Sequence, residues 1–95
     1  MSESRTLRLP AQCDLRSVPS LRGDMLAALD GAAAVTLDCA DVERADMAFV
    51  QLVLAAGMSA ARRGVSLALT NRTAGLDVAF CRAGLDPSAP PMPAL

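Results

Sequence analysis

Carboxylates that follow a buried strand are the residues of this chain whose type and position could do chemistry. Asp38 ends an apolar run, and Asp41 follows it in a short acidic turn. An aspartate at a strand end can accept a phosphoryl group, but that reaction also needs an acidic pair for magnesium and a lysine for the phosphoryl oxygens. The chain contains no lysine and is too short for the strand–helix repeat that frames such sites. We therefore expect Asp38 and Asp41 to bind nearby backbone N–H groups.

The other reactive residue types give no catalytic set either. Histidine is absent, which removes imidazole as a general base and weakens metal binding. No glycine-rich loop of the kind that cradles phosphate occurs. Cys13, Cys39 and Cys81 are odd in number and lack the spacing of a zinc site or a disulfide framework. We predict three buried free thiols, no metal, no cofactor and no enzymatic activity.

The composition predicts one folded domain of ordinary charge. Residues 1–85 are expected to form the domain, and the proline-rich residues 86–95 a flexible tail. Ten acidic residues stand against nine arginines without a basic stripe, so no nucleic-acid partner is expected. The sequence shows no signal peptide and no apolar run long enough to span a bilayer. We expect a cytoplasmic protein without direct membrane insertion.

Strand-like and helix-like segments alternate along the chain. Apolar or alternating stretches predict strands over residues 6–9, 33–39 and 65–70. Helical spacing follows each of them, and the expected N-caps of the three helices are Ser17, Asp46 and Thr73. Crossovers this short imply parallel pairing with right-handed connections. The predicted fold is α/β, a small sheet with helices packed mainly on one face.

The long helix predicted from about Met47 to Arg63 is apolar nearly all round. One set of its residues should face the sheet: Phe49, Leu52, Val53, Ala56 and Ala60. A second set follows another face: Met47, Gln51, Leu54 or Ala55, Met58 and Arg62. Either the other helices cover this second face, which periodicity alone slightly favours, or it is an exposed surface for another protein.

One segment resembles a known family. The stretch DCADVERADMAFVQL, residues 38–52, is similar to the strand-to-helix segment of STAS domains, the fold of anti-sigma-factor antagonists, and Asp38, Val42, Asp46 and Leu52 fall at matching offsets. The leading LRLP strand, the RRGVSLALTN segment and the closing Gly84-Leu85 follow in the family's order. The resemblance implies a STAS-like small mixed β-sheet with helices mainly on one face.

The resemblance also implies a regulatory position that this chain has altered. In regulatory members a partner kinase phosphorylates a serine or threonine two residues after the loop aspartate, a position that is Ala48 here, and Phe49 replaces the glycine that follows. Neither Ala48 nor Met47 can accept phosphate. The start of this helix is therefore expected to be a docking surface without the phosphorylation switch. A phosphorylated hydroxyl elsewhere, such as Ser59 or Thr73, is a weaker alternative.

The expected function is that of a non-catalytic STAS adaptor that binds another protein. Its partner would be a kinase, an anti-sigma factor or a chemotaxis component in bacterial signalling. The alternative is a cytosolic STAS accessory subunit that binds the ATPase of a lipid-asymmetry ABC transporter. An exposed edge strand over residues 6–9 also makes a homodimer conceivable. The predicted partner-binding residues are Asp41, Glu43, Arg44, Asp46, Met47, Gln51 and Met58.

Overall fold

The computed structural model describes residues 3–85, so the predicted tail over 86–95 lies outside the described residues. A three-stranded sheet runs through it in the order β1 (Ser4–Arg8), β3 (Ala34–Asp38) and β5 (Ser66–Thr70). Leu7 pairs with Leu37 and Leu37 with Leu69, so one row of side chains crosses all three strands. Every strand pairing among residues 3–85 is parallel. The short crossovers predicted this direction, whereas the mixed sheet implied by the family resemblance is not what these residues form.

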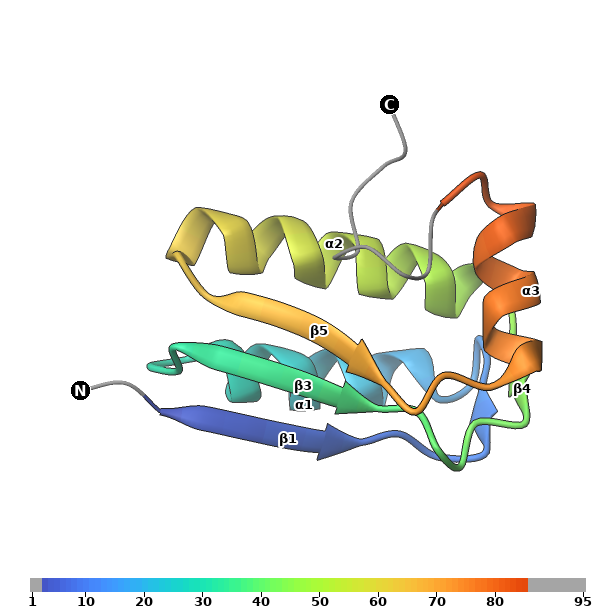
Figure 1. Cartoon of the computed structure of the whole chain (residues 1–95), viewed down its shortest axis with the longest axis horizontal. Helices are drawn as coiled ribbons and strands as arrows, with labels where there is room; N and C mark the ends of the chain where they lie inside the picture. The colour runs from blue at the N-terminus through green and yellow to red at the C-terminus, as the bar shows by residue number, and fades with distance from the viewer. Residues whose placement is uncertain (1–2, 86–95) are drawn as a thin grey trace.

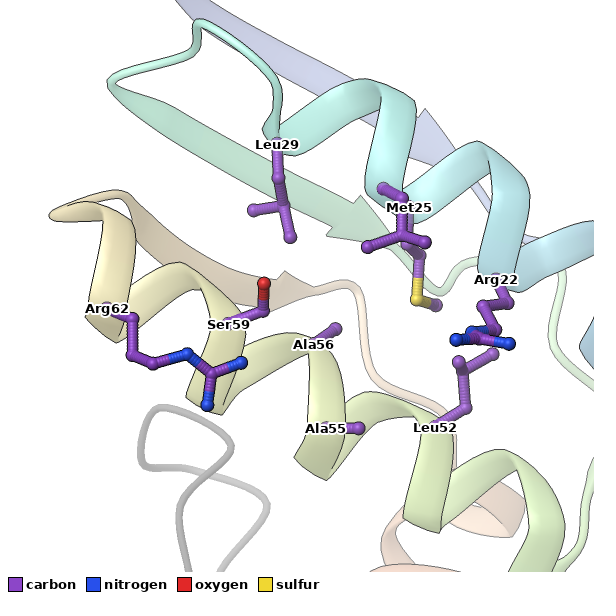
Figure 2. A pocket seen from close by; sticks show the side chains of 9 residues that line it. Arg22, Met25, Leu29, Leu52, Ala55, Ala56, Ser59 and Arg62 are labelled. Carbon is purple, nitrogen blue, oxygen red and sulfur yellow. The ribbon is translucent and has the colours of Figure 1, made fainter.

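The structure has the three predicted helices, and two of them cover one face of the sheet. Helices α1 (Val18–Leu29) and α2 (Met47–Arg63) lie side by side on one face, and α3 (Ala74–Arg82) stands at the end where α2 begins (Figure 1). A groove remains between α1 and α2, and Leu52 lies on its wall (Figure 2). Leu52 is half-buried and packs against the core, whereas Val50, which was not in the predicted set, is fully buried.

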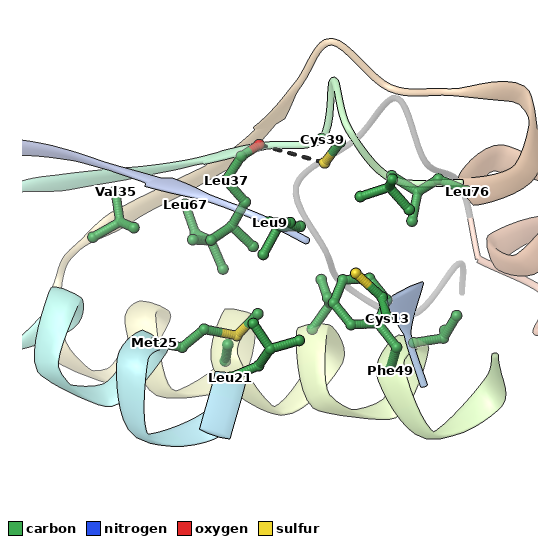
Figure 3. Close-up of a cluster of buried hydrophobic side chains, with 14 of the residues drawn as sticks. Leu9, Cys13, Leu21, Met25, Val35, Leu37, Cys39, Phe49, Leu67 and Leu76 are labelled. Carbon is green, nitrogen blue, oxygen red and sulfur yellow. Dashed lines mark hydrogen bonds between the residues drawn. The ribbon is translucent and has the colours of Figure 1, made fainter. Parts of the chain in front are cut away.

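The side chains between the sheet and the two helices form the core. Val35, Leu37 and Leu67 point from the strands toward Met25 and other side chains of the helices (Figure 3). Alternation along β3 explains this arrangement, because Val35 and Leu37 are buried while residues 34, 36 and 38 are half-buried on the other face. Phe49 of α2 and Phe80 of α3 are the largest fully buried side chains and link the two helices to this core.

The prediction of three buried thiols is correct for two of them. Cys13 and Cys39 are buried and free, and burial raises the pKa of each thiol to about 11. Cys81 is free but exposed. It follows Phe80 on α3 and so turns away from the core that Phe80 fills, because neighbouring helical positions point about 100° apart.

Two very short strands were not predicted. β2 (Gln12–Cys13) and β4 (Arg44–Ala45) pair in parallel, outside the segments expected to be strands. Both Glu43 and Arg44 donate their backbone N–H groups to the carbonyl oxygen of Ala11, at 2.9 and 3.0 Å. This pairing ties the loop before α1 to the loop before α2, so it determines what surrounds the start of α2.

Local signals predicted most helix ends. Asp46 caps α2, Thr73 caps α3, and Gly64 and Gly84 end α2 and α3 with φ of 69° and 76°. Ser17 precedes α1 but its side chain caps nothing; the hydroxyl accepts from the backbone N–H of Asp14 at 3.0 Å. The turn before α1 is instead organised by Asp14, whose carboxylate accepts from the N–H groups of residues 16 and 17.

Within residues 3–85, no helix is both long and apolar enough to cross a bilayer.

Candidate docking surface

The carboxylate of Asp46 joins two segments at the start of α2. Its Oδ1 accepts from the backbone N–H of Phe49 at 3.1 Å, which caps the helix. Its Oδ2 accepts from the backbone N–H of Leu15 at 3.1 Å, 31 residues earlier in the chain. A carboxylate has enough acceptor sites for both bonds. Asp46 therefore holds the loop before α1 beside the first turn of α2.

Exposed apolar side chains gather around this junction. Leu15 is 72% exposed, Met47 is 47% exposed, and Val78 on α3 is 49% exposed. Next to Met47 is a hollow of about 320 Å³, whose other lining residues are Ala45, Asp46, Ala79 and Arg82. Val78 lies one helical turn before Arg82, on the side of α3 that faces away from the core. We call Leu15, Met47, Val78, Ala79 and Arg82 the α2-start surface.

A close backbone approach sets the position of α3 in this surface. A Cβ atom on Gly75 would lie 3.0 Å from the carbonyl oxygen of Glu43, in the segment that leads into β4. Glycine therefore lets the first turn of α3 pack directly on that segment. Because β4 leads straight into α2, this packing also brings Ala79 and Arg82 of α3 to the hollow that Met47 lines.

A polar cluster lies at the carboxyl ends of the sheet strands, in the predicted acidic turn. Asp38 accepts from the side-chain amide of Asn71 and from the backbone N–H of Ala40, both at 3.1 Å. The bond from Asn71, followed by the bond from Ala40, lowers the pKa of Asp38 below its usual value. The prediction that Asp38 binds a local N–H is confirmed. Asp41 instead forms a two-point ion pair with Arg8, at 2.7 and 3.2 Å.

The predicted partner-binding residues are only partly brought together. Asp46 and Met47 line the hollow described above, and exposed Gln51 follows Met47 one helical turn later. The side chains of Glu43, directly before β4, and Arg44, the first residue of β4, are exposed. Asp41 lies elsewhere, in a hollow that Arg8, Ser17 and Asp24 also line. Met58 is 47% exposed but lies three helical turns beyond Met47.

The structure also places Ala48, the family's phosphorylation position, and the two hydroxyl residues considered as alternatives to it. Ala48 is half-buried in the first turn of α2. Thr73 uses its hydroxyl to accept from the backbone N–H of Leu76, which is the cap of α3. Ser59 lines the groove between α1 and α2. None of these positions belongs to the α2-start surface.

Four members of the surface are not among the predicted partner-binding residues. Ala79 belongs to the pattern that predicts the buried side of α3, and the other three belong to no periodic pattern. Leu15 lies in an irregular turn, where an apolar residue has no face to be assigned to. Val78 and Arg82 lie off the spacing of Leu76, Ala79 and Phe80, which predicts only the buried side of α3. Val78 alone offers a signal in the sequence, as an apolar residue that lies off the buried side of an amphipathic helix.

The surface offers apolar contact area with a guanidinium at its rim. Among residues 3–85, no three His, Cys, Asp or Glu side chains converge in a way that could hold a metal ion. Its Asp46 carboxylate is already engaged by two backbone N–H groups. The geometry thus suits contact with another protein.

Comparison with known proteins identifies one matching family. Residues 1–92 match the family described as the Mlab STAS domain. No curated protein matches the chain. The family match covers nearly the whole sequence, and the α/β structure of this chain, with a parallel sheet and three helices, is consistent with the STAS fold. The chain therefore belongs to the STAS domain family, in the group described as Mlab.

Proposed function

We propose that this chain is a non-catalytic adaptor that binds a partner protein through the α2-start surface. The observation that carries the proposal is a junction of three segments: Asp46 holds exposed Leu15 beside exposed Met47, and Ala79 and Arg82 of α3 line the same hollow as Met47. Exposed Val78 directly precedes Ala79 on α3. Exposed apolar side chains that cluster mark interaction sites more often than single ones do. Membership of the STAS family supports the proposal, because STAS domains are generally non-catalytic.

The docking would proceed without a phosphorylation switch at the family's usual position. That position is Ala48, whose side chain carries no hydroxyl. A phosphate there would add nearly two negative charges at the start of α2, directly beside Met47. In this chain the same turn remains apolar, so its affinity for a partner would not change with kinase activity at that site.

Two partner classes fit such a surface. One is a signalling protein: a kinase, an anti-sigma factor or a chemotaxis component. The other is the ATPase of a lipid-asymmetry ABC transporter, for which the chain would be an accessory subunit. The Mlab description of the matching family favours the transporter setting, since it does not describe an anti-sigma-factor antagonist.

An NMR titration can test the proposal and choose between the partners. The ¹⁵N-labelled chain would be titrated with the purified transporter ATPase and, separately, with an anti-sigma kinase from the same genome. We expect the amide signals of Leu15, Met47, Val78 and Arg82 to shift with the ATPase, while those of the open sheet face around Thr36 stay in place. Shifts confined to the sheet face would contradict the proposed surface. Shifts at the α2-start surface with the kinase alone would support the proposed surface and show that the partner is the kinase instead of the ATPase.

A further inference from the structure

The groove between α1 and α2 is a second surface, separate from the α2-start surface. Its α1 wall is formed by Arg22, Met25, Leu26 and Leu29, and its α2 wall by Leu52, Ala55, Ala56, Ser59 and Arg62 (Figure 2). The residues on each wall recur at three- and four-residue spacing, so two helical stripes face each other along the groove. Leu26 is 41% exposed, and Leu52 is half-buried. The floor is therefore apolar and open to solvent.

Both charges in the groove are positive and lack a partner among residues 3–85. Arg22 and Arg62 are exposed, and neither forms an ion pair or a side-chain hydrogen bond with a described residue. No acidic residue lines the groove. Asp24, the nearest acid on α1, lines the hollow that contains Arg8 and Asp41 instead. A groove with two unpaired arginines and no acid favours an acidic ligand.

The two arginines lie at different ends of the groove. Arg22 lies near Leu52, whereas Arg62 lies beyond Ser59 at the other end (Figure 2). Leu52 and Arg62 are ten positions apart on α2, which corresponds to about 15 Å along the helix axis. A single carboxylate could reach only one of the two arginines. A helix of about three turns, with an acidic residue near each end, could reach both.

The size of the groove points to the same class of ligand. It encloses about 190 Å³, and alanines form part of its α2 wall. Pockets that hold small molecules usually enclose about 300–1,000 Å³. A shallow trough between two helices can instead accept the apolar side chains of a third helix laid along it.

We propose that the α1–α2 groove binds an acidic amphipathic helix of a partner protein. The helix places apolar side chains over Leu26, Leu52 and Ala55, and its acidic residues pair with Arg22 and Arg62. This interaction goes beyond the docking proposed for the α2-start surface and does not depend on it. Together the two surfaces let one small domain hold two segments at once.

A designed peptide provides a direct probe. It would be a fluorescein-labelled helix of about 14 residues with leucines at positions i, i+3, i+4 and i+7 and a glutamate near each end. Fluorescence anisotropy measures its affinity for the wild-type chain, for the double variant Arg22→Glu/Arg62→Glu, and for Arg63→Glu. Arg63 is the matched control, because it is exposed, carries the same charge and lies next to Arg62 but outside the groove.

We expect the double charge reversal to weaken binding about tenfold or more, since each pair changes from attraction to repulsion. The Arg63→Glu variant should stay within about twofold of wild type. A second peptide with lysines in place of the glutamates should bind the double variant better than it binds the wild-type chain. Equal losses in the double variant and in Arg63→Glu would overturn the proposal, as would undetectable binding of the first peptide to the wild-type chain. Met47→Asp should not change peptide affinity, and a loss there would place the peptide on the other surface and overturn the assignment.

Discussion

Asp46 accepts a hydrogen bond from the backbone N–H of Leu15 while it caps α2 through Phe49, with both distances at 3.1 Å. One carboxylate thus couples the stability of a helix start to the position of an exposed leucine. The adjoining residue Met47 is exposed as well. The α2-start surface is therefore built around the cap of the long helix.

Replacing Asp46 by alanine should both destabilise the fold and loosen the surface. Loss of an N-cap costs about 1 kcal/mol, and the N–H of Leu15 also loses its acceptor. We expect the free energy of unfolding, measured by urea denaturation, to fall by about 1–2 kcal/mol. Asp46→Asn is the matched control, since asparagine caps helices nearly as well and should lose less. An alanine variant as stable as the wild type would show that the cap contributes nothing.

Gly75 and Gly23 should respond differently to the same change. Alanine at Gly23, inside α1, meets no atom within 4 Å and should stabilise the fold by about 0.5–1 kcal/mol through better helix propensity. Alanine at Gly75 would place its Cβ 3.0 Å from the carbonyl oxygen of Glu43, so the same gain should be lost or reversed. Thermal unfolding of the two variants measures the difference. Equal stabilisation at both positions would show that α3 can shift away from β4 freely.

The Gly75→Ala substitution should also affect partner binding. If α3 moves away from the segment that leads into β4, Ala79 and Arg82 move away from Met47, with which they line one hollow. We expect Gly75→Ala to weaken partner binding more than Gly23→Ala does in the same titration.

The bond between Asn71 and Asp38 should make stability depend on pH in the acid range. The pKa of Asp38 is lowered in the folded chain, so its charged form stabilises the fold above the unfolded-state pKa, and this contribution disappears as the pH falls through the folded-state pKa. Asn71→Gly removes the donor and suits the φ of 55° at this position. The stability gap between wild type and variant should therefore be present at pH 7 and shrink below about pH 4.

An amide at position 38, which cannot titrate, controls this pH experiment. In an Asp38→Asn background, Asn71→Gly should produce a gap that does not change between pH 7 and pH 3. A gap that grows as the wild-type chain is acidified would reverse the sign of the linkage and contradict the lowered pKa.

The three thiols should label in two classes. In the folded chain at pH 8, iodoacetamide should modify exposed Cys81, whereas Cys13 and Cys39 are buried with a pKa of about 11 and should react only after unfolding in urea. Intact mass gives the number of adducts and peptide mapping gives their positions. Rapid modification of Cys13 in the folded chain would mean that the core near β2 opens readily.

The sequence predicted the parts of this fold that depend on neighbours a few residues away. Asp46, Thr73, Gly64 and Gly84 act within one helical turn, so their roles could be read from order alone. The three sheet strands were also predicted, because alternation and β-branched residues distinguish them from helices.

The features that escaped prediction depend on contacts between distant segments. The β2–β4 pair is two residues long on each side, too short for any periodic pattern. Its existence follows from the return of the chain to Ala11, which places Leu15 beside Asp46. The local sequence likewise does not show whether Asp14 or Ser17 organises the start of α1, because both side chains favour helix starts. The docking surface depends on these contacts between distant segments. The sequence alone could therefore identify only Asp46, Met47 and the helix that they begin.

The central claim is that partner proteins dock on the α2-start surface, and isothermal titration of charge variants tests it most directly. Met47→Asp and Val78→Asp should each weaken binding of the partner identified by NMR by about tenfold or more, because a buried contact centre would then hold an unpaired carboxylate. Ala27→Asp is the matched control and should bind as the wild type does, because Ala27 is exposed on α1 and lines neither the groove nor either hollow. If both Met47→Asp and Val78→Asp remain folded by circular dichroism and still bind with wild-type affinity, the α2-start surface is not where the partner docks.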